Sequence, residues 1–412
     1  MALPISGLIT AAMINDELGR AQTAPFSLNG AEERALAGIP SGAISFADFY
    51  GKSNLPDLGY LFGYRDPNYS ETLPAQSTNI GDSFNHACMS EDGQYLLVAD
   101  RTNKNIRLSV RSGNTWSVVQ TITDAALGYG KVVVCDRTMT NICVGLYTGA
   151  VTSADELRFY TRSGNALTAR TTIIQSPLTY QVGRSLAMDP DTGDVVSFAN
   201  VAVVYYERSG TSWSQKQVLR TASIGLNNGA IRGDWIVTGH TSGPARIYLY
   251  NRAGSGSNFS LHSTLYTSAN SSSRGPCAAI SSDASVVAYT YTIGTGDVST
   301  LKIQSRSGTT YTDQFTFTLP DNGPFNPEHM VMNESGNFLL IHHNSEIKEF
   351  KNEGGTWSQT KVYDTADVSP NSGVDGLAAT STCNYMMIGN YNGIVDGKQT
   401  IRRGGVTIFG NA

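Results

Sequence analysis

The sequence has little charge and no cluster of basic residues. Charged residues make up 15% of its 412 residues, and 29 Lys and Arg against 34 Asp and Glu give a formal net charge of −5. Proteins bind the nucleic-acid backbone through clustered Lys and Arg. This composition therefore argues against nucleic acid as a partner.

Long apolar runs are also missing. No stretch approaches the roughly 20 apolar residues that cross a bilayer as a helix, so we expect no membrane span. The apolar start, residues 1–14, has no Lys or Arg, contains Pro4 and leads directly into Asn15, Asp16 and Glu17. A secretory signal begins with a positively charged stretch, so we expect no signal peptide.

Common catalytic and metal-binding motifs are absent as well. There is no Gly-x-Ser-x-Gly, no Walker loop and no His-Glu-x-x-His, and the five cysteines form no CxxC pair. Residues 189–194 have the carboxylate density of a fragmentary calcium loop, but they also stand where other repeats place a turn. His342 and His343 are adjacent in an expected strand, where successive side chains face opposite ways. We predict no catalytic residue, metal or cofactor, with an ion at residues 189–194 as the alternative.

The sequence does contain one motif that occurs six times. It consists of an apolar strand, a Gly turn and a second strand that commonly begins with an aromatic residue. The closest copies are residues 106–122, 157–173, 203–219 and 301–319, and the weaker ones are residues 247–265 and 347–363. Six hairpins of one kind indicate a repeat architecture.

The turn glycines give the pitch of the repeat. They are Gly113, Gly164, Gly210, Gly254, Gly308 and Gly355. By subtraction, they are separated by 51, 46, 44, 54 and 47 residues. A propeller blade of four short antiparallel strands needs roughly 40 to 50 residues. Two more strand-like segments precede the hairpins, and the first is built of small residues, as strands that converge on a central axis require.

Large aromatic residues follow the turn in most copies. Outer strands diverge and can carry rings that wedge between neighbouring blades, each burying roughly 150 to 250 Å². We interpret these rings as structural inter-blade residues rather than as a sugar-stacking platform. They are Trp116, Trp213, Phe259, Tyr311 and Trp357. Arginines that recur before the turn indicate a structural role at the hairpin, and they are Arg111, Arg162, Arg208 and Arg306.

The repeats predict a mainly β fold with seven blades, the last one composite. Strands expected at residues 374–380, 385–389 and 406–410 lack a fourth partner, which residues 69–73 can supply. Pairing the two ends removes an exposed sheet edge and closes the ring. We therefore predict a seven-bladed β-propeller over residues 54–412, closed by N- and C-terminal strands.

The first 53 residues differ from the rest and predict a small module with short helices. Thr10 can cap a helix that Gly19 ends, and Asn29 can cap a second one before Gly38. The segment SGLITAAMI at residue 6 returns as SGAISFADF at residue 41, an offset of 35 residues. This repetition indicates two related small units around one miniature core.

This segment resembles an N-terminal module of many tailed-bacteriophage virion proteins, especially tail, baseplate and fibre components. The matching motifs are Ile14-Asn15-Asp16-Glu17-Leu18-Gly19-Arg20, Arg34-Ala35-Leu36-Ala37-Gly38 and Asp48-Phe49-Tyr50-Gly51-Lys52-Ser53. Phe46 and Ala47 depart from the pattern, which is commonly more polar there. The resemblance implies a virion structural protein, made in the host cytoplasm and present in multiple copies per particle.

In such a protein, residues 1–53 dock on another virion protein and the propeller is displayed, which implies recognition of a host-surface glycan or protein. The side chains expected to serve docking, partly within the module and partly at the interface, are Ile9, Ile14, Leu18, Leu28, Leu36, Ile44, Phe46 and Phe49. One alternative is a purely architectural collar, baseplate or capsid-decoration protein. A second is a glycan-processing enzyme, but the turn RSGTSW lacks the aspartate of the sialidase Asp-box, so we expect no enzyme.

Overall fold

The structure is a computed structural model, and it places two compact units in the chain. One unit consists mainly of Met1–Gly59 and the other mainly of residues 60–408. The described residues are 9–18, 23–37, 39, 41–49, 84–100, 105–112, 115–123, 130–146, 155–175, 183, 185–199, 202–221, 229–240, 244–268, 277–292, 299–319, 329–343, 346–364, 374–381, 385–390, 395–396, 399–400 and 405–410. The predicted domain boundary and the predicted closing strand at residues 69–73 lie outside them.

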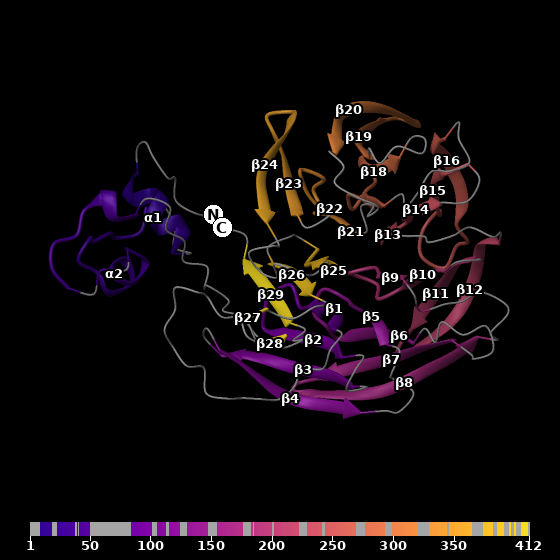
Figure 1. Cartoon of the computed structure of the whole chain (residues 1–412), viewed down its shortest axis with the longest axis horizontal. Coiled ribbons are helices and arrows are strands. Elements are labelled where there is room, and N and C mark those ends of the chain that lie inside the picture. The colour runs from indigo at the N-terminus through magenta and orange to yellow at the C-terminus, as the bar shows by residue number, and fades with distance from the viewer. Residues whose placement is uncertain are drawn as a thin grey trace. The chain divides into compact units, whose positions relative to one another are not determined.

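The N-terminal module contains two short α-helices, α1 (Ala11–Glu17) and α2 (Ala31–Ala37), and a 3₁₀ turn, η1 (Phe46–Phe49) (Figure 1). The hydroxyl of Thr10 accepts a hydrogen bond from the Met13 N–H at 3.3 Å, so Thr10 is the predicted cap of α1. Within the described part of the chain, no helix is long and apolar enough to span a membrane.

The two related sequence units occupy equivalent places in the module. At the offset of 35 residues, Thr10 corresponds to Ser45, and both stand directly before a helical turn. The Ser45 N–H and hydroxyl donate to the Asp48 carboxylate at 2.7 and 2.9 Å. Ile14 and Phe49, which also correspond, are both 0% exposed and belong to one hydrophobic cluster. The two units therefore share one core, as the sequence predicts.

The predicted cap of α2 is wrong by one residue. The first helical hydrogen bond runs from the Arg34 N–H to the Gly30 carbonyl at 2.9 Å, so Gly30 is the cap and Asn29 precedes it. The Asn29 side chain instead accepts a hydrogen bond from the Arg34 Nε at 2.8 Å. A Cβ on residue 30 would lie 2.0 Å from the Glu33 carboxylate, so a larger residue here would have to displace the Glu33 side chain.

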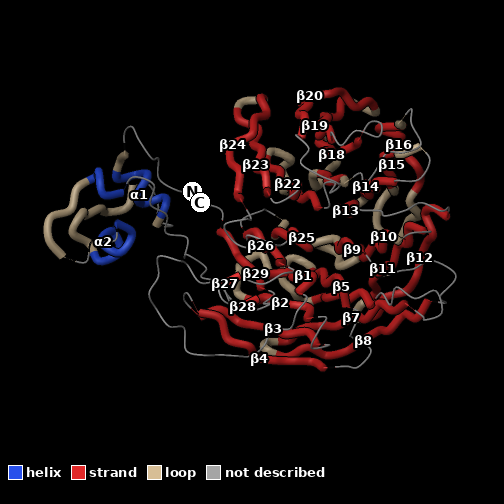
Figure 2. Tube along the Cα trace, viewed as in Figure 1, coloured by secondary structure: helices blue, strands red, loops and turns tan. Residues whose placement is uncertain are grey.

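The second unit is a series of antiparallel sheets, each with its strands in chain order (Figure 2). The first three sheets are β1 (Phe84–Met89), β2 (Tyr95–Asp100), β3 (Asn105–Ser112) and β4 (Thr115–Thr123); β5 (Gly130–Cys135), β6 (Asn141–Leu146), β7 (Asp155–Ser163) and β8 (Ala166–Gln175); and β9 (Ser185–Met188), β10 (Val195–Phe198), β11 (Ala202–Ser209) and β12 (Ser212–Thr221). The next three are β13 (Gly229–Arg232), β14 (Trp235–His240), β15 (Arg246–Asn251) and β16 (Ser260–Thr267); β17 (Ala278–Ile280), β18 (Val286–Thr292), β19 (Ser299–Ser307) and β20 (Thr310–Leu319); and β21 (His329–Met332), β22 (Phe338–His343), β23 (Glu346–Glu353) and β24 (Thr356–Asp364).

The seventh sheet has three described strands, β25 (Val374–Ala379), β26 (Tyr385–Asn390) and β29 (Gly405–Gly410), in that order. They match the three C-terminal strands that the sequence predicts. A separate short hairpin, β27 (Val395–Asp396) with β28 (Gln399–Thr400), stands between β26 and β29 in the chain, and the sequence did not predict it.

The first strands of the sheets form a closed ring. Each contacts the first strand of the next sheet in the chain, and β25 of the seventh sheet contacts β1 of the first (Figure 1). Small residues such as Ala278 and Ala279 in β17 allow this close approach. The predicted mainly β propeller fold is therefore confirmed, with six four-stranded sheets and a seventh of three described strands.

The repeated hairpins of the sequence are the third and fourth strands of the sheets. At the described turn glycines φ is positive, with values of +61° at Gly210 and +63° at Gly308. Five of these hairpins contain a register shift, such as those of β19 with β20 and β23 with β24. Such bulges increase the twist that lets outer strands diverge.

Candidate functional site

Most of the predicted docking side chains face the interior of the module. The buried ones are Ile9, Ile14, Leu36 and Phe49, and those that pack partly buried against them are Leu18, Leu28 and Ile44. Phe46 differs from the rest, because 38% of its surface is exposed. A partner can therefore reach Phe46 on the folded module, whereas the buried side chains serve the core.

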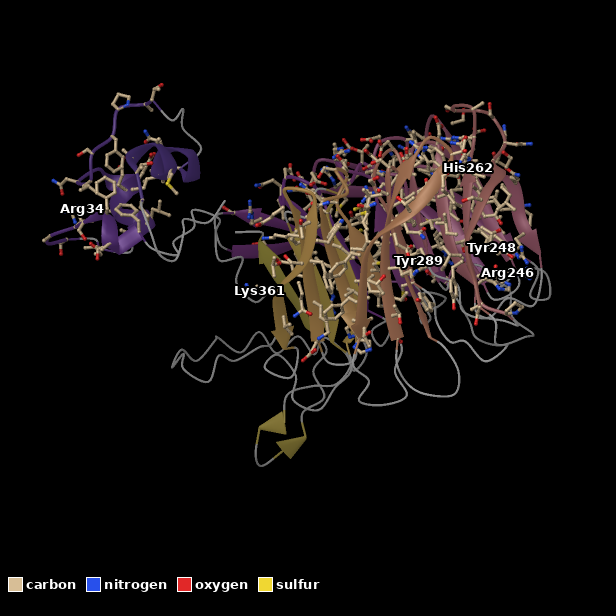
Figure 3. The ribbon with its side chains drawn as sticks, turned by 90° about the horizontal axis from the view of Figure 1, so that it is seen from above. Arg34, Arg246, Tyr248, His262, Tyr289 and Lys361 are labelled. Atoms are coloured by element: carbon tan, nitrogen blue, oxygen red, sulfur yellow. The ribbon has the colours of Figure 1, made fainter. Side chains whose placement is uncertain are left out.

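Polar residues of the phage-like motifs fix the module's own loops. The Asn15 side-chain amide donates to the Ala24 carbonyl at 2.9 Å. The Arg34 guanidinium donates to the carbonyls of Ile39 and Gly42 at 3.1 and 2.9 Å (Figure 3). These bonds give Asn15 and Arg34 a structural role within the module.

The exposed Phe46 lies against a second aromatic ring, the partly buried Phe26. The Phe46 ring stacks on Phe26 with centroids 5.7 Å apart and planes 21° apart. Phe26 also lines a shallow depression of about 440 Å³ together with Pro25, Ala31 and the acidic Glu32. We call Phe26 and Phe46 the aromatic pair.

The predicted inter-blade aromatics lie between adjacent sheets wherever their side chains are described. Trp213 is 3% exposed, stacks on Phe159 of the preceding sheet at 4.7 Å and donates its indole N–H to the Gly193 carbonyl at 2.9 Å. Phe259 meets Tyr205 of the preceding sheet edge-on at 5.0 Å. Trp357 and Tyr311 pack in clusters that join two neighbouring sheets. The side chain of Trp116 lies outside the described residues.

Three of the recurring arginines, Arg162, Arg208 and Arg306, bond to the turn between the first two strands of their own sheet. Arg162 donates to the carbonyls of Met139 and Thr138 at 3.1 and 2.7 Å, and Arg306 donates to the Asp283 carbonyl at 2.9 Å. The Arg162 guanidinium also lies over the ring of Tyr95 in the preceding sheet, 3.6 Å from its centroid. These contacts give the arginines a structural role at the turns.

The turns between first and second strands are joined into a turn belt, defined as residues 90–94, 136–140, 189–194, 233–234, 281–285, 333–337 and 380–381. The Glu91 N–H donates to the Arg137 carbonyl at 2.8 Å, and the Arg137 N–H donates to the Pro190 carbonyl at 2.9 Å. The Ser381 N–H and hydroxyl donate to the Glu91 carboxylate at 2.8 and 2.7 Å. The last bonds link the seventh sheet to the first across 290 residues of sequence.

Arg137 is the centre of the turn belt. Its guanidinium donates to the Ser381 hydroxyl at 2.8 Å and the Asp191 carboxylate at 2.9 Å, and it pairs with Glu334. Burial alone would raise the pKa of Glu334, but the hydrogen bond and the charge of Arg137 hold that pKa below its usual value. The sequence analysis missed Arg137, whose partners lie 54 to 244 residues away. Only its place in a repeated turn could have singled it out.

The carboxylates of the candidate calcium loop are engaged by protein donors. Asp189 accepts from the N–H groups of Asp191 and Thr192 at 3.1 and 2.7 Å. Asp194 accepts from the Tyr205 hydroxyl at 2.7 Å and from Arg252 at 3.3 Å. Within the described residues, no group of three or more His, Cys, Asp or Glu is arranged to hold a metal ion.

The two adjacent histidines lie in the interior of the sixth sheet. His342 and His343 are both buried in β22, and the ring of His342 stacks on His329 of β21 at 6.3 Å. Buried imidazoles in a sheet are typical of packing residues.

No protein-family model and no curated protein matches this chain. Among solved structures, it is similar to hydrazine synthase of Kuenenia stuttgartiensis, with 11% identity and a TM-score of 0.55 over 84% of this chain and 99% of that one. It is also similar to U3-55K, with 10% identity and a TM-score of 0.55 over 80% of this chain and 95% of that one. A protein of Lactobacillus plantarum has 14% identity and a TM-score of 0.50 over 68% of this chain and 84% of that one. At these identities, the likeness shows the propeller-like fold and nothing of the activity.

Proposed function

We propose that this chain is a structural protein of a tailed-bacteriophage particle. In this proposal, the N-terminal module docks on another virion protein and the propeller is displayed for recognition of the host surface. The support for docking begins with the motif residues: Asn15 and Arg34 fix the loops of a small self-contained core. A module of this kind can keep one fold in many proteins while its exposed residues change with the partner.

The observation that carries the docking proposal is the exposure of Phe46. It is the one member of the predicted docking set that is exposed, and it stands where the phage-like pattern is commonly polar. Aromatic side chains are enriched among the residues that dominate binding energy at protein interfaces. Stacking on Phe26 holds the Phe46 ring in place before binding, which lowers the entropy lost on docking.

The propeller half of the proposal depends on a stable scaffold. The turn belt joins the seven sheets through hydrogen bonds and ion pairs, so the sheets form a fixed frame. Binding residues are commonly placed on loops that a rigid scaffold positions. An architectural role is the alternative, and it requires both ends of the propeller to be covered in the assembled particle.

The test of docking compares variants of the full chain for entry into particles. We expect Phe46→Ser to reduce the amount of protein that co-purifies with virions by about tenfold or more, since an aromatic hot spot contributes about 2 kcal/mol and tenfold corresponds to about 1.4 kcal/mol. The matched control is Ala47→Ser, an exposed neighbour that also departs from the polar pattern. Circular dichroism should show both variants folded.

Deletion of residues 1–53 provides the broader test. If the truncated chain still enters particles, the docking proposal fails. If deletion prevents entry but Phe46→Ser does not, the module docks through a surface other than the aromatic pair. Adsorption of the isolated protein to host cells then tests recognition separately, and no adsorption to permissive hosts would favour the architectural alternative.

A further inference from the structure

A cationic cluster lies at the end of the sheets away from the turn belt. His240 ends β14 and pairs in register with Arg246, which begins β15 of the same sheet. Arg220 reaches the cluster from β12, the outermost strand of the preceding sheet. Figure 3 shows Arg246 beside Tyr248 and far from His262, which lies toward the other end of the sheet.

The side chains of the cluster gather around Tyr248. The Arg246 guanidinium donates to the Tyr248 hydroxyl at 3.0 Å, and the Arg220 guanidinium lies over the Tyr248 ring, 4.5 Å from its centroid. The His240 ring meets Tyr248 edge-on at 6.2 Å. One tyrosine thus holds two guanidinium groups and an imidazole in one place.

The positive charge of this cluster has no carboxylate partner among the described residues. Neither Arg220 nor Arg246 forms an ion pair there, whereas Arg252 in the same sheet contacts two aspartates. The Nε of Arg220 is buried and has no hydrogen-bond partner in the described structure. In sequence, the connections at residues 222–228, 241–243 and 269–276 contain no Asp or Glu and add one arginine. A buried donor without a partner is costly, which makes it a candidate for bonding to a ligand.

His240 supplies the second, independent observation. It is 6% exposed, and within the described residues neither of its ring nitrogens meets hydrogen-bond geometry with a partner. Burial, followed by the charges of Arg220 and Arg246, lowers the pKa of His240 to about 4, while the nearby Pro244 carbonyl acts in the opposite direction. At neutral pH the imidazole is therefore uncharged and carries one N–H available for donation.

We propose that Arg220, His240 and Arg246 bind an oxyanion, namely the carboxylate or phosphate group of an acidic host-surface glycan. The guanidinium groups supply charge-assisted donors in the planar geometry that matches such oxyanions, and the imidazole N–H adds a neutral donor. Both arginines are partly exposed, so a ligand can reach them without unfolding the sheet. The glycan as ligand rests on the proposed host recognition, whereas the anion site rests on this geometry alone.

The test uses the full-length protein with three probes: inorganic phosphate, glucuronate and neutral glucose, at constant ionic strength set by chloride. We expect phosphate, glucuronate or both to bind saturably in calorimetric titrations, and glucose not to bind. Binding of glucuronate alone would identify a carboxylate site, and binding of phosphate alone a phosphate site. Replacing either arginine should weaken anion binding by about tenfold or more, because each replacement removes charge-assisted hydrogen bonds to the anion.

The variants are Arg246→Gln and Arg220→Gln, with Arg170→Gln as the matched control. Arg170 is an exposed arginine on β8 that donates to Thr161 at 2.7 Å, so its loss changes the net charge equally without touching the cluster. A second readout is the NMR titration of His240. A bound anion should raise the pKa of His240, because a nearby negative charge favours the protonated ring.

If Arg220 and Arg246 serve only to stabilise the packing around Tyr248, a different result is expected. In that case neither phosphate nor glucuronate binds, and neither moves the His240 titration. The proposal is overturned by that outcome, and also by anion binding that survives the double variant Arg220→Gln/Arg246→Gln. If Arg220→Gln fails to fold, Arg246→Gln alone is used for the test. Arg246 lies at a strand end, so its replacement should disturb the fold less. Particle entry is measured separately, so failure here leaves the docking proposal unaffected.

Discussion

Two groups of arginines, at opposite ends of the propeller sheets, differ in the partners that their charge meets. At the turn belt, Arg137 meets Asp191, Glu334 and Ser381, and these contacts join distant sheets. At the other end, Arg220 and Arg246 meet Tyr248 and no described carboxylate. The difference separates arginines that hold the ring together from arginines whose hydrogen-bonding capacity is left for a ligand.

The largest effect should come from removing a buried, fully paired arginine. The Arg252 side chain is 1% exposed and contacts Asp194, whose side chain is 4% exposed. Arg252→Met should lower the free energy of unfolding by about 3–5 kcal/mol, because it leaves a buried carboxylate uncompensated. Arg220→Met should cost less than about 1 kcal/mol, since it removes a cation–π contact and no ion pair. Urea unfolding of both variants measures the difference, and equal losses would mean that the two groups of arginines do not differ.

A smaller loss is expected at the centre of the turn belt. Arg137→Met removes partly exposed ion pairs, and solvent screening limits the cost to about 1–2 kcal/mol. Because the pKa of Glu334 is lowered in the folded protein, its stabilising effect is present above the ordinary Glu pKa and is lost as pH falls through the folded value. The gap in melting temperature between wild type and variant should therefore shrink from pH 7 to pH 3. A gap independent of pH would show that Glu334 does not depend on Arg137.

The contact between the first and seventh sheets should contribute less to the free energy of unfolding than Arg137 does. Ser381→Ala removes a hydroxyl that accepts from Arg137 and donates to Glu91, while the Ser381 backbone N–H still bonds to Glu91. We expect a loss of about 1 kcal/mol in the free energy of unfolding. Ser212→Ala, at an exposed hairpin position, is the control. No difference between the two variants would contradict a role for this hydroxyl in ring closure.

The smallest expected effect is a shift in the pKa of His240, with the fold unchanged. In Arg220→Gln/Arg246→Gln, the pKa of His240 should rise from about 4 but stay below 6.5, because burial, the largest cause of its shift, is retained. Wild type should lose stability as pH falls from 6.5 toward 4, since the unfolded chain binds the proton more readily, and the variant should lose less over that interval. NMR titration of the His240 ring measures the shift. An unchanged pKa would mean that the arginines do not act on His240.

Local features of the fold could be predicted from sequence because they repeat or cap locally. The positive-φ turn at Gly210, the ring at Trp213 and the cap at Thr10 each depend on neighbours within a few residues or on a repeated position. The cap of α2 was misplaced because Asn29 suits a cap as a residue type but is occupied by Arg34. The predicted composite closure of the seventh sheet stays a prediction, because residues 69–73 lie outside the described structure.

The candidate sites could be predicted only in part. Phe46 was one of eight apolar docking candidates, and the pattern of the module did not distinguish it from the buried Phe49 three residues away. The cluster of Arg220, His240 and Arg246 was not predicted, because β12 and β15 belong to different sheets. Its one sequence signal is the lack of acidic residues in the adjoining connections.

By itself, the sequence determined the repeated hairpins, the wedge aromatics and the mainly β propeller, since these follow from local spacing and side-chain size. The tertiary structure alone decided which charges meet. Arg137 reaches Glu334 across 197 residues, and Arg252 reaches Asp194 across 58. Whether an arginine is paired depends on which turns and strand ends the closed ring brings together, and electrostatic energy depends on that distance rather than on separation along the chain.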